Sequence, residues 1–196
     1  MARTTKTATA KVVDDRKKNF LTEAEINKFF DAARKGRHGV RDHAMALMTF
    51  RHGLRVSELI GVRVKDVELN SSHLHVRRIK GSLSTNQPVA GDELRAIKAW
   101  LRVREERPDA RSPYLFLSER GGPLTRQAIG LLFRAIGGRA GLADVNPHML
   151  RHSTGFYLAN KGYDTRLIQD YLGHKNISNT MIYTRTAASR FEGLWR

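Results

Sequence analysis

The sequence predicts a mainly α-helical fold that carries one small antiparallel β-sheet. Apolar residues recur at helical spacing over most of the chain, whereas one central region alternates apolar with polar residues. A length of 196 residues fits one domain with a single hydrophobic core. We therefore expect a domain over residues 20–185, preceded by a flexible basic arm (1–19) and followed by a C-terminal tail (186–196).

The first half of the chain contains three helix signals. Thr22 and Glu25 have the spacing of a capping box, which opens a helix. The stretch "RDHAMALMTFRHG" predicts a second, largely buried helix that ends near Gly53. "RVSELIGV" predicts a short third helix with Arg55 close to its first turn.

The alternating region predicts three short strands. Val67 and Leu69 precede the turn "NSS", and Leu74 and Val76 follow it, with polar residues between the members of each pair. A third strand near "NQPVA" follows the loop "KGSLST". The antiparallel sheet that results places Lys80 at the tip of its second hairpin.

Four helices are expected after the sheet, and residues with known cap or breaker preferences mark their bounds. The first starts at Asp92 and ends before Pro108, and Thr125 caps the second. Asn146-Pro147 starts the third, which carries His148, Arg151 and His152 and ends near Gly162. Asp164 caps the fourth, which ends at Gly173.

The charge balance points to a polyanionic partner. The chain has 35 Lys and Arg against 19 Asp and Glu, a formal net charge of +16. Phosphate contacts offset such charge and release counterions, so nucleic acid is favoured over a merely basic solubility surface. The sequence contains no cysteine, which excludes disulfides, thiolate metal sites and a cysteine nucleophile. No membrane-length apolar run or secretory signal is evident, and a cytoplasmic location is expected.

Several basic residues have the spacing of an anion site. His148 and Arg151 are three residues apart and share a helix face, and Arg55 lies between two helices where it can point into a cleft. Each taken alone could be a solvated surface group. A metal site built from His148, His152 and His174 is less favoured, because Arg151 lies between the first two and no glutamate takes the general-base position.

Four motifs in order resemble the tyrosine recombinase, or phage-integrase, family. They are "HGLRVSEL", "HMLRH", "YLGH" and Tyr183, nine residues beyond His174, and the resemblance extends over about residues 20–190. It implies the tyrosine recombinase catalytic domain fold. In its compactness the chain is similar to the short recombinases that invert fimbrial promoter segments.

The resemblance also implies the roles of individual residues. Arg55 and Arg151 would clamp the scissile phosphate, Tyr183 would be the nucleophile, and Glu58 would support the site. His148 and His174 would be the active-site histidines, and Lys80 would protonate the leaving 5′ oxygen, with Lys65 as the alternative lysine. A 3′-phosphotyrosyl intermediate preserves the energy of the DNA bond, so no metal, ATP or other cofactor is expected.

The partners follow from the same resemblance. We expect double-stranded DNA with inverted-repeat sites, a homo-tetramer on paired sites that is a monomer or weak dimer when free, DNA-bending accessory proteins, and no membrane. Residues 186–196 either pack on their own domain or dock on a neighbouring protomer. The expected function is inversion of a promoter segment in fimbrial phase variation. The alternatives are integration or excision of a mobile element, relaxation by a type IB topoisomerase, and a non-catalytic DNA-binding regulator.

Overall fold

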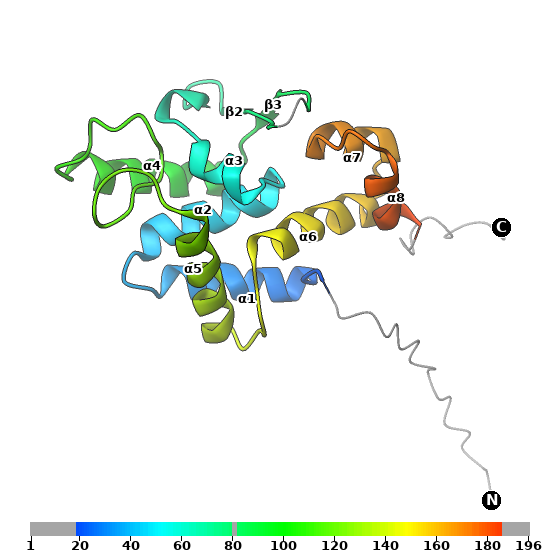
Figure 1. Ribbon diagram of the computed structural model, residues 1–196, viewed down its shortest axis with the longest axis horizontal. Coiled ribbons are helices and arrows are strands. Elements are labelled where there is room, and N and C mark those ends of the chain that lie inside the picture. Colours follow the sequence, from blue (N-terminus) through cyan, green and yellow to red (C-terminus); the bar gives the residue numbers. More distant parts are fainter. Residues whose placement is uncertain (1–18, 80–81, 186–196) are drawn as a thin grey trace, which may run out of the picture.

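The computed structural model describes residues 19–79 and 82–185, and confirms a mainly helical fold with one small sheet (Figure 1). The described chain forms the following helices: α1 (Glu23–Arg34), α2 (Gly39–Arg51), α3 (Val56–Gly61), α4 (Gly91–Glu105), α5 (Arg126–Arg139), α6 (Pro147–Asn160), α7 (Thr165–Leu172) and α8 (Ser178–Thr184). A 3₁₀ turn, η1 (Val64–Asp66), precedes the strands β1 (Val67–Glu68), β2 (His73–Val76) and β3 (Thr85–Pro88).

The predicted helix starts are confirmed by their cap hydrogen bonds. The backbone N–H of Thr22 donates to the Glu25 carboxylate at 2.8 Å, which completes the capping box of α1. Asn146 accepts from the backbone of α6, where Pro147 occupies the first turn and loses no hydrogen bond. The Asp164 carboxylate accepts two backbone N–H groups at the start of α7.

Helix α2 is the centre of the main core. Nine consecutive residues, 41–49, are buried, so α2 is surrounded on all sides rather than along one stripe. It packs against α1, α3, α4 and α6, and α5 packs against α1 and α3 (Figure 1). This arrangement fixes the C-terminal end of α2 relative to α6.

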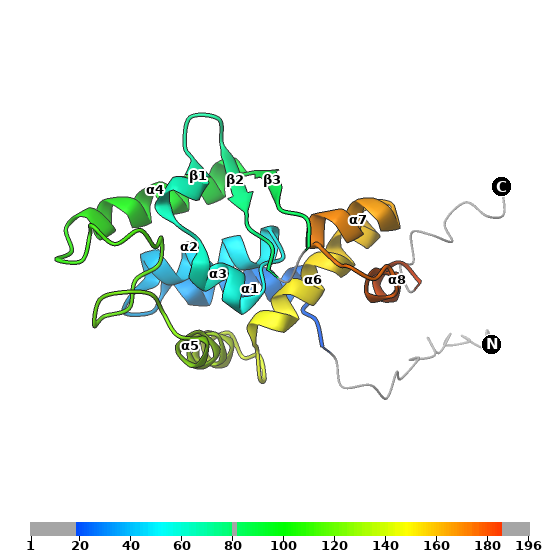
Figure 2. The same cartoon turned by 45° about the horizontal axis from the view of Figure 1, so that its top comes forward.

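The sheet is antiparallel in the order β1-β2-β3 and lies above α2 in Figure 2. Leu74 pairs with Val67 on one side and with Gln87 on the other. Leu74 and Val76 are buried against the main core, as their alternation predicts. Lys80, expected at the tip of the second hairpin, lies outside the described residues.

A second, smaller core lies where α6, α7 and α8 meet. Ala159, Ile168, Leu172 and Tyr183 are buried in it, and Phe156 packs against them. Phe20, which precedes α1, also packs against this region, since its ring centroid is 4.1 Å from that of Phe156. Tyr183 therefore belongs to a packing unit distinct from the core around α2.

Residues 1–18 of the expected arm and the whole expected tail, 186–196, lie outside the described residues. Across 19–79 and 82–185, no helix combines the length and apolar character that crossing a bilayer requires.

We expect Phe133→Ala to lower the free energy of unfolding by about 3–5 kcal/mol, because it removes a large buried ring. The Phe133 side chain is fully buried, and its ring centroid is 5.5 Å from that of Phe29 across the α1–α5 contact. Urea denaturation measures this loss. Leu131→Ala, at a side chain of the same helix that is 55% exposed, is the matched control and should change stability by less than about 1 kcal/mol. Equal losses in both variants would contradict the assignment of the α5 core face.

Candidate active site

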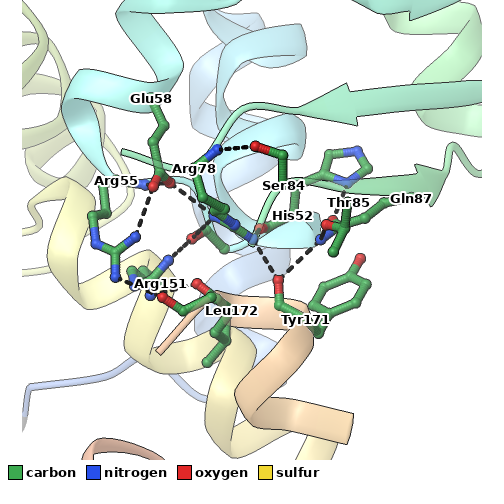
Figure 3. Close-up of polar contacts among 12 residues, drawn as sticks. His52, Arg55, Glu58, Arg78, Ser84, Thr85, Gln87, Arg151, Tyr171 and Leu172 are labelled. Carbon is green, nitrogen blue, oxygen red and sulfur yellow. Dashed lines mark hydrogen bonds and ion pairs between the residues drawn. The ribbon is translucent and has the colours of Figure 1, made fainter. Parts of the chain in front are cut away.

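Three guanidinium groups meet the C-terminal end of α7 (Figure 3). Arg78, Arg151 and Arg55 donate, in that order, to the three consecutive carbonyls of residues 171–173, at 2.5, 2.8 and 3.1 Å. The last carbonyls of a helix lack partners within it and carry the negative end of its dipole. The end of α7 is thus capped by arginines, which hold it in a defined place.

Two of the same arginines also donate to carbonyls at the C-terminal end of α2. Arg151 and Arg78 both donate to the Gly53 carbonyl, and Arg78 also donates to the His52 carbonyl at 2.9 Å. Gly53 has a positive φ of 54°, and a β-carbon there would lie 2.3 Å from the Leu172 side chain. Only glycine permits both this turn and the close approach of α2 to α7.

Glu58 is the acidic partner of this cluster. Its carboxylate lies 2.7 Å from Nη1 of Arg55 and 2.8 Å from Nη1 of Arg78, and it also accepts the backbone N–H of Arg55. Burial alone would raise the pKa of Glu58, but the charge of Arg78 and the hydrogen bonds from Arg55 hold it below its usual value. Glu58 therefore stays ionised while buried.

The cluster retains an excess of positive charge. The cluster has three guanidiniums and one carboxylate, which pairs with Arg55 and Arg78. Burial together with repulsion from Arg55 and Arg78 lowers the pKa of Arg151 to about 9. Arg151 is still charged at neutral pH. A bound anion would relieve this repulsion, and the planar donor fork of an arginine suits two oxygens of a phosphate.

Tyr183 lies beside this cluster, in α8. The residue is 1% exposed, and its hydroxyl oxygen is 2.9 Å from Nδ1 of His152. The ring of His174 stacks near it, with centroids 6.2 Å apart and an interplanar angle of 25°. Burial raises the pKa of the Tyr183 hydroxyl, and the charges of Arg151 and Arg55 act against that rise.

Gly155 makes room for the Tyr183 ring. A β-carbon at this position of α6 would lie 2.5–2.6 Å from three carbons of the ring, closer than real contacts allow. The absence of a side chain at Gly155 is therefore what admits the tyrosine to the face of α6.

The two predicted active-site histidines lie in different surroundings. His174 is partly buried, and its Nδ1 is 2.9 Å from the Thr180 hydroxyl. Burial and the positive charge of Arg151 lower the pKa of His174 to about 4, so its ring is neutral at pH 7. His148 is exposed on the first turn of α6, with its ring centroid 6.4 Å from that of His152.

The structure thus brings together Arg55, Glu58, Arg151, His174 and Tyr183, and leaves His148 at the open edge of α6. Lys80 lies outside the described residues, and the alternative Lys65 is exposed in η1.

Two further residues line the site, Arg78 and His152, and neither was predicted from the sequence as part of it. For Arg78 a signal was present: it continues the alternation of Leu74 and Val76, which places it on the buried face of the hairpin. For His152 no local signal indicated that its ring would meet Tyr183.

Comparison with known proteins identifies the family to which this chain belongs. Residues 19–190 match the phage integrase family, and the chain belongs to that family. Its relatives include the Type 1 fimbriae regulatory protein FimB of Escherichia coli strain K12, 46% identical over 93% of this chain and 92% of FimB. The corresponding FimE is 42% identical over 91% of each chain. The predicted similarity to the family and to its short fimbrial members is confirmed.

Solved structures confirm the predicted catalytic-domain fold. The crystal structure of XerA recombinase has a TM-score of 0.77 and 31% identity, over 87% of this chain and 61% of that one. The XerH site-specific recombinase bound to palindromic difH substrate, a post-cleavage complex, has a TM-score of 0.77 and 25% identity, over 93% and 54%. The chain therefore spans about three fifths of the XerA recombinase chain and about half of the XerH chain.

We expect Gly155→Ala to displace the Tyr183 ring and destabilise the protein by about 1–3 kcal/mol, because the new methyl group overlaps the ring. Urea denaturation reports the stability, and hydrogen exchange reports faster opening of α8. Gly130→Ala is the control, since that glycine lies in α5 with open space around its missing side chain and should be neutral or slightly stabilising. Unchanged exchange in α8 of Gly155→Ala would show that the ring has room elsewhere.

We expect stability to fall as the pH drops from about 6.5 to 4, in part because of His174. Its folded pKa of about 4 lies below the ordinary 6.5, so the unfolded chain takes up a proton first and is favoured as pH decreases through this window. His174→Asn keeps an acceptor for the Thr180 hydroxyl. Between pH 7 and pH 4 its free energy of unfolding should fall by about 1–3 kcal/mol less than that of the parent protein, an upper range because the ring is partly solvated. Denaturant midpoints measured at pH 7, 6, 5 and 4 test this, and parallel curves for both proteins would contradict it.

Proposed function

We propose that this chain is a site-specific DNA recombinase that cuts and rejoins DNA through a 3′-phosphotyrosyl bond to Tyr183. The observation that carries the proposal is the position of one buried tyrosine beside Arg55 and Arg151, within a cluster whose positive charge exceeds its negative charge. Membership of the phage integrase family and similarity to a site-specific recombinase bound to its DNA substrate support it.

Arg55, Arg151 and His174 act on the scissile phosphate. The phenolic oxygen of Tyr183 attacks phosphorus, a new P–O bond forms, and the bond from phosphorus to the 5′ oxygen breaks. Negative charge grows on the non-bridging oxygens in the transition state, and preorganised guanidinium donors stabilise it there. Arg151, 4% exposed, is fixed by carbonyls at two helix ends, whereas the Arg55 side chain is 29% exposed and open to a ligand.

The proton of Tyr183 must leave before or during attack. An unperturbed tyrosine has a pKa of about 10, and burial raises the value further here. His152 lies 2.9 Å from the hydroxyl, and burial and the nearby His148 and Arg151 lower its pKa, so a neutral ring is available to accept the proton. His148 stands one turn earlier on α6, open to the DNA.

Lys80 supplies the proton for the leaving 5′ oxygen in this proposal. A free 5′ hydroxyl results, while the 3′ end stays on Tyr183. Attack by the 5′ hydroxyl of a second strand on the phosphotyrosine reverses the chemistry and rejoins DNA in a new combination. The energy of the first bond is retained, and the step needs neither ATP nor a metal ion.

The biological reaction we propose is inversion of a promoter segment flanked by inverted repeats. The relatives FimB and FimE are named as fimbriae regulatory proteins, and this chain matches nearly their full lengths. Inversion requires two sites and four strand cleavages, which fits a homo-tetramer on DNA formed from monomers or weak dimers. In that assembly residues 1–19 would follow DNA phosphates and residues 186–196 would dock on a neighbouring protomer. DNA-bending proteins would help to bring the two sites together.

We expect Tyr183→Phe to abolish covalent DNA–protein adducts while DNA binding stays within about twofold, because only the attacking oxygen is removed. A nicked suicide substrate, incubated without metal and analysed on denaturing gels, measures the adduct. Tyr171→Phe is the matched control: its hydroxyl donates to the Arg51 carbonyl, its pKa is raised to about 12 by burial, and adduct formation should persist. Adducts formed by Tyr183→Phe would refute the assignment.

A further inference from the structure

The hydroxyl of Thr180 is a buried polar group that the proposed chemistry does not use. Thr180 lies in α8 and is 0% exposed. Its Oγ1 is 2.9 Å from Nδ1 of His174, and in the part of the chain that the structure describes this hydroxyl has no other hydrogen-bond partner. A buried O–H without an acceptor is costly, so the hydroxyl proton is directed at Nδ1.

The direction of this hydrogen bond fixes the tautomer of His174. Burial and the positive charges of Arg151 and Arg55 lower the pKa of His174 to about 4, so at pH 7 the neutral ring carries a single N–H. Because Nδ1 accepts from Thr180, it is unprotonated. The ring proton therefore lies on Nε2, which makes that nitrogen a hydrogen-bond donor.

The backbone of His174 is held in place as well as its ring. The His174 N–H donates to the Gln169 carbonyl at 3.0 Å, and the Gln169 side-chain amide donates to the His174 carbonyl at 3.0 Å. Both polar groups of the His174 backbone are thus bonded to one residue of α7. The bond from Thr180 adds a third point, on the ring itself, and rotation of the ring would break it.

The ring lies next to both parts of the proposed site. Its centroid is 6.2 Å from that of Tyr183, and its pKa responds to the charges of Arg151 and Arg55. Among the described residues nothing accepts a hydrogen bond from Nε2 of His174, and the residue is only partly buried. The Nε2–H group can therefore donate to a ligand, and an anionic phosphate oxygen is a strong acceptor.

We propose that Thr180 is a positioning residue: its hydroxyl holds His174 as the Nε2–H tautomer, so that this N–H donates to a non-bridging oxygen of the scissile phosphate. This inference deepens the function proposed above for His174 and Tyr183 and rests on it.

The direction of the hydrogen bond determines the sign of a measurable change. Donation to Nδ1 stabilises the neutral ring and so lowers the pKa of His174. Thr180→Val keeps the shape of the side chain and removes the hydroxyl, so the pKa of His174 should rise by about 0.5–1 from its value of about 4. If Nδ1–H instead donated to the threonine, the same substitution would lower the pKa.

Nitrogen NMR of the labelled full-length protein measures the tautomer and the pKa without DNA, and His174→Asn identifies the resonances of the ring. At pH 7 in the parent protein, Nδ1 should have the shift of an unprotonated nitrogen and Nε2 that of a protonated one. A titration from pH 7 to 4.5 should show that protonation begins at higher pH in Thr180→Val. The other groups that act on His174 are the same in both proteins, so their effects cancel: Arg151 and His152 on α6, Arg55 before α3 and Arg78 after β2.

Single-turnover cleavage of a nicked DNA substrate measures the consequence for the reaction. Thr180→Val should be at least about tenfold slower than the parent protein at unchanged DNA binding, because a misaligned donor loses part of the roughly 100-fold or more that one such donor supplies. Thr180→Ser keeps the hydroxyl and should stay within about threefold of the parent rate. Thr184→Val is the matched control: it removes another hydroxyl of α8, which accepts from Thr165 at 3.1 Å, and should change neither the rate nor the pKa of His174.

The outcomes are distinguishable. If Nδ1 carries the proton in the parent protein, or if Thr180→Val lowers the pKa of His174 or leaves it unchanged, the inference is wrong. It is also wrong if Thr180→Val cleaves at the parent rate, or if Thr184→Val or Thr180→Ser loses as much as Thr180→Val. If the parent protein forms no adduct with DNA, the proposed function is overturned and the inference falls with it, a failure separate from that of the tautomer, which is measured without DNA.

Discussion

The structure of the site depends on arginines that bond to the ends of two helices. Helices α2 and α7 come from distant parts of the sequence, and each directs free carbonyls at the same small volume. Two like ends of helix dipoles repel unless cations lie between them. Arg78 and Arg151 provide those cations, and each bonds to both ends. The groups that join the helices thus also create the positive potential on which the proposed phosphate recognition depends.

The proposed nucleophile, Tyr183, is packed in a different core from the arginines. Tyr183 is buried with Ile168 and Leu172 in the smaller core, and α8 packs mainly against α6 and α7. Few apolar residues hold this core, so local opening there costs less than opening of the main core. In the proposed function, the phosphate-binding arginines therefore bond to helix ends beside the main core, whereas the attacking oxygen lies in the smaller core, which opens more easily.

Most of the fold could be predicted from the sequence because its signals are local. The side chains of Thr22, Asn146 and Asp164 accept from backbone N–H groups within three residues, and strand alternation requires only neighbouring positions. The contacts of the site are not local. Arg151 bonds to a carbonyl 98 residues away, and Arg78 to one 93 residues away, so no window of sequence contains both partners. The motifs indicated which residues converge, but the acceptors became known only from the structure.

Arg151 and Gly155 are separated by four residues on α6 and therefore face the same side of that helix. One position presents a guanidinium and the next turn presents a bare notch that the ring of Tyr183 fills. The backbone positions of Arg151 and Gly155 are thus separated along the helix axis by about 6 Å, slightly more than one turn. A tilt or slide of α6 carries both positions along as one body, so the backbone separation between Arg151 and the seat of the Tyr183 ring is set by this helix alone.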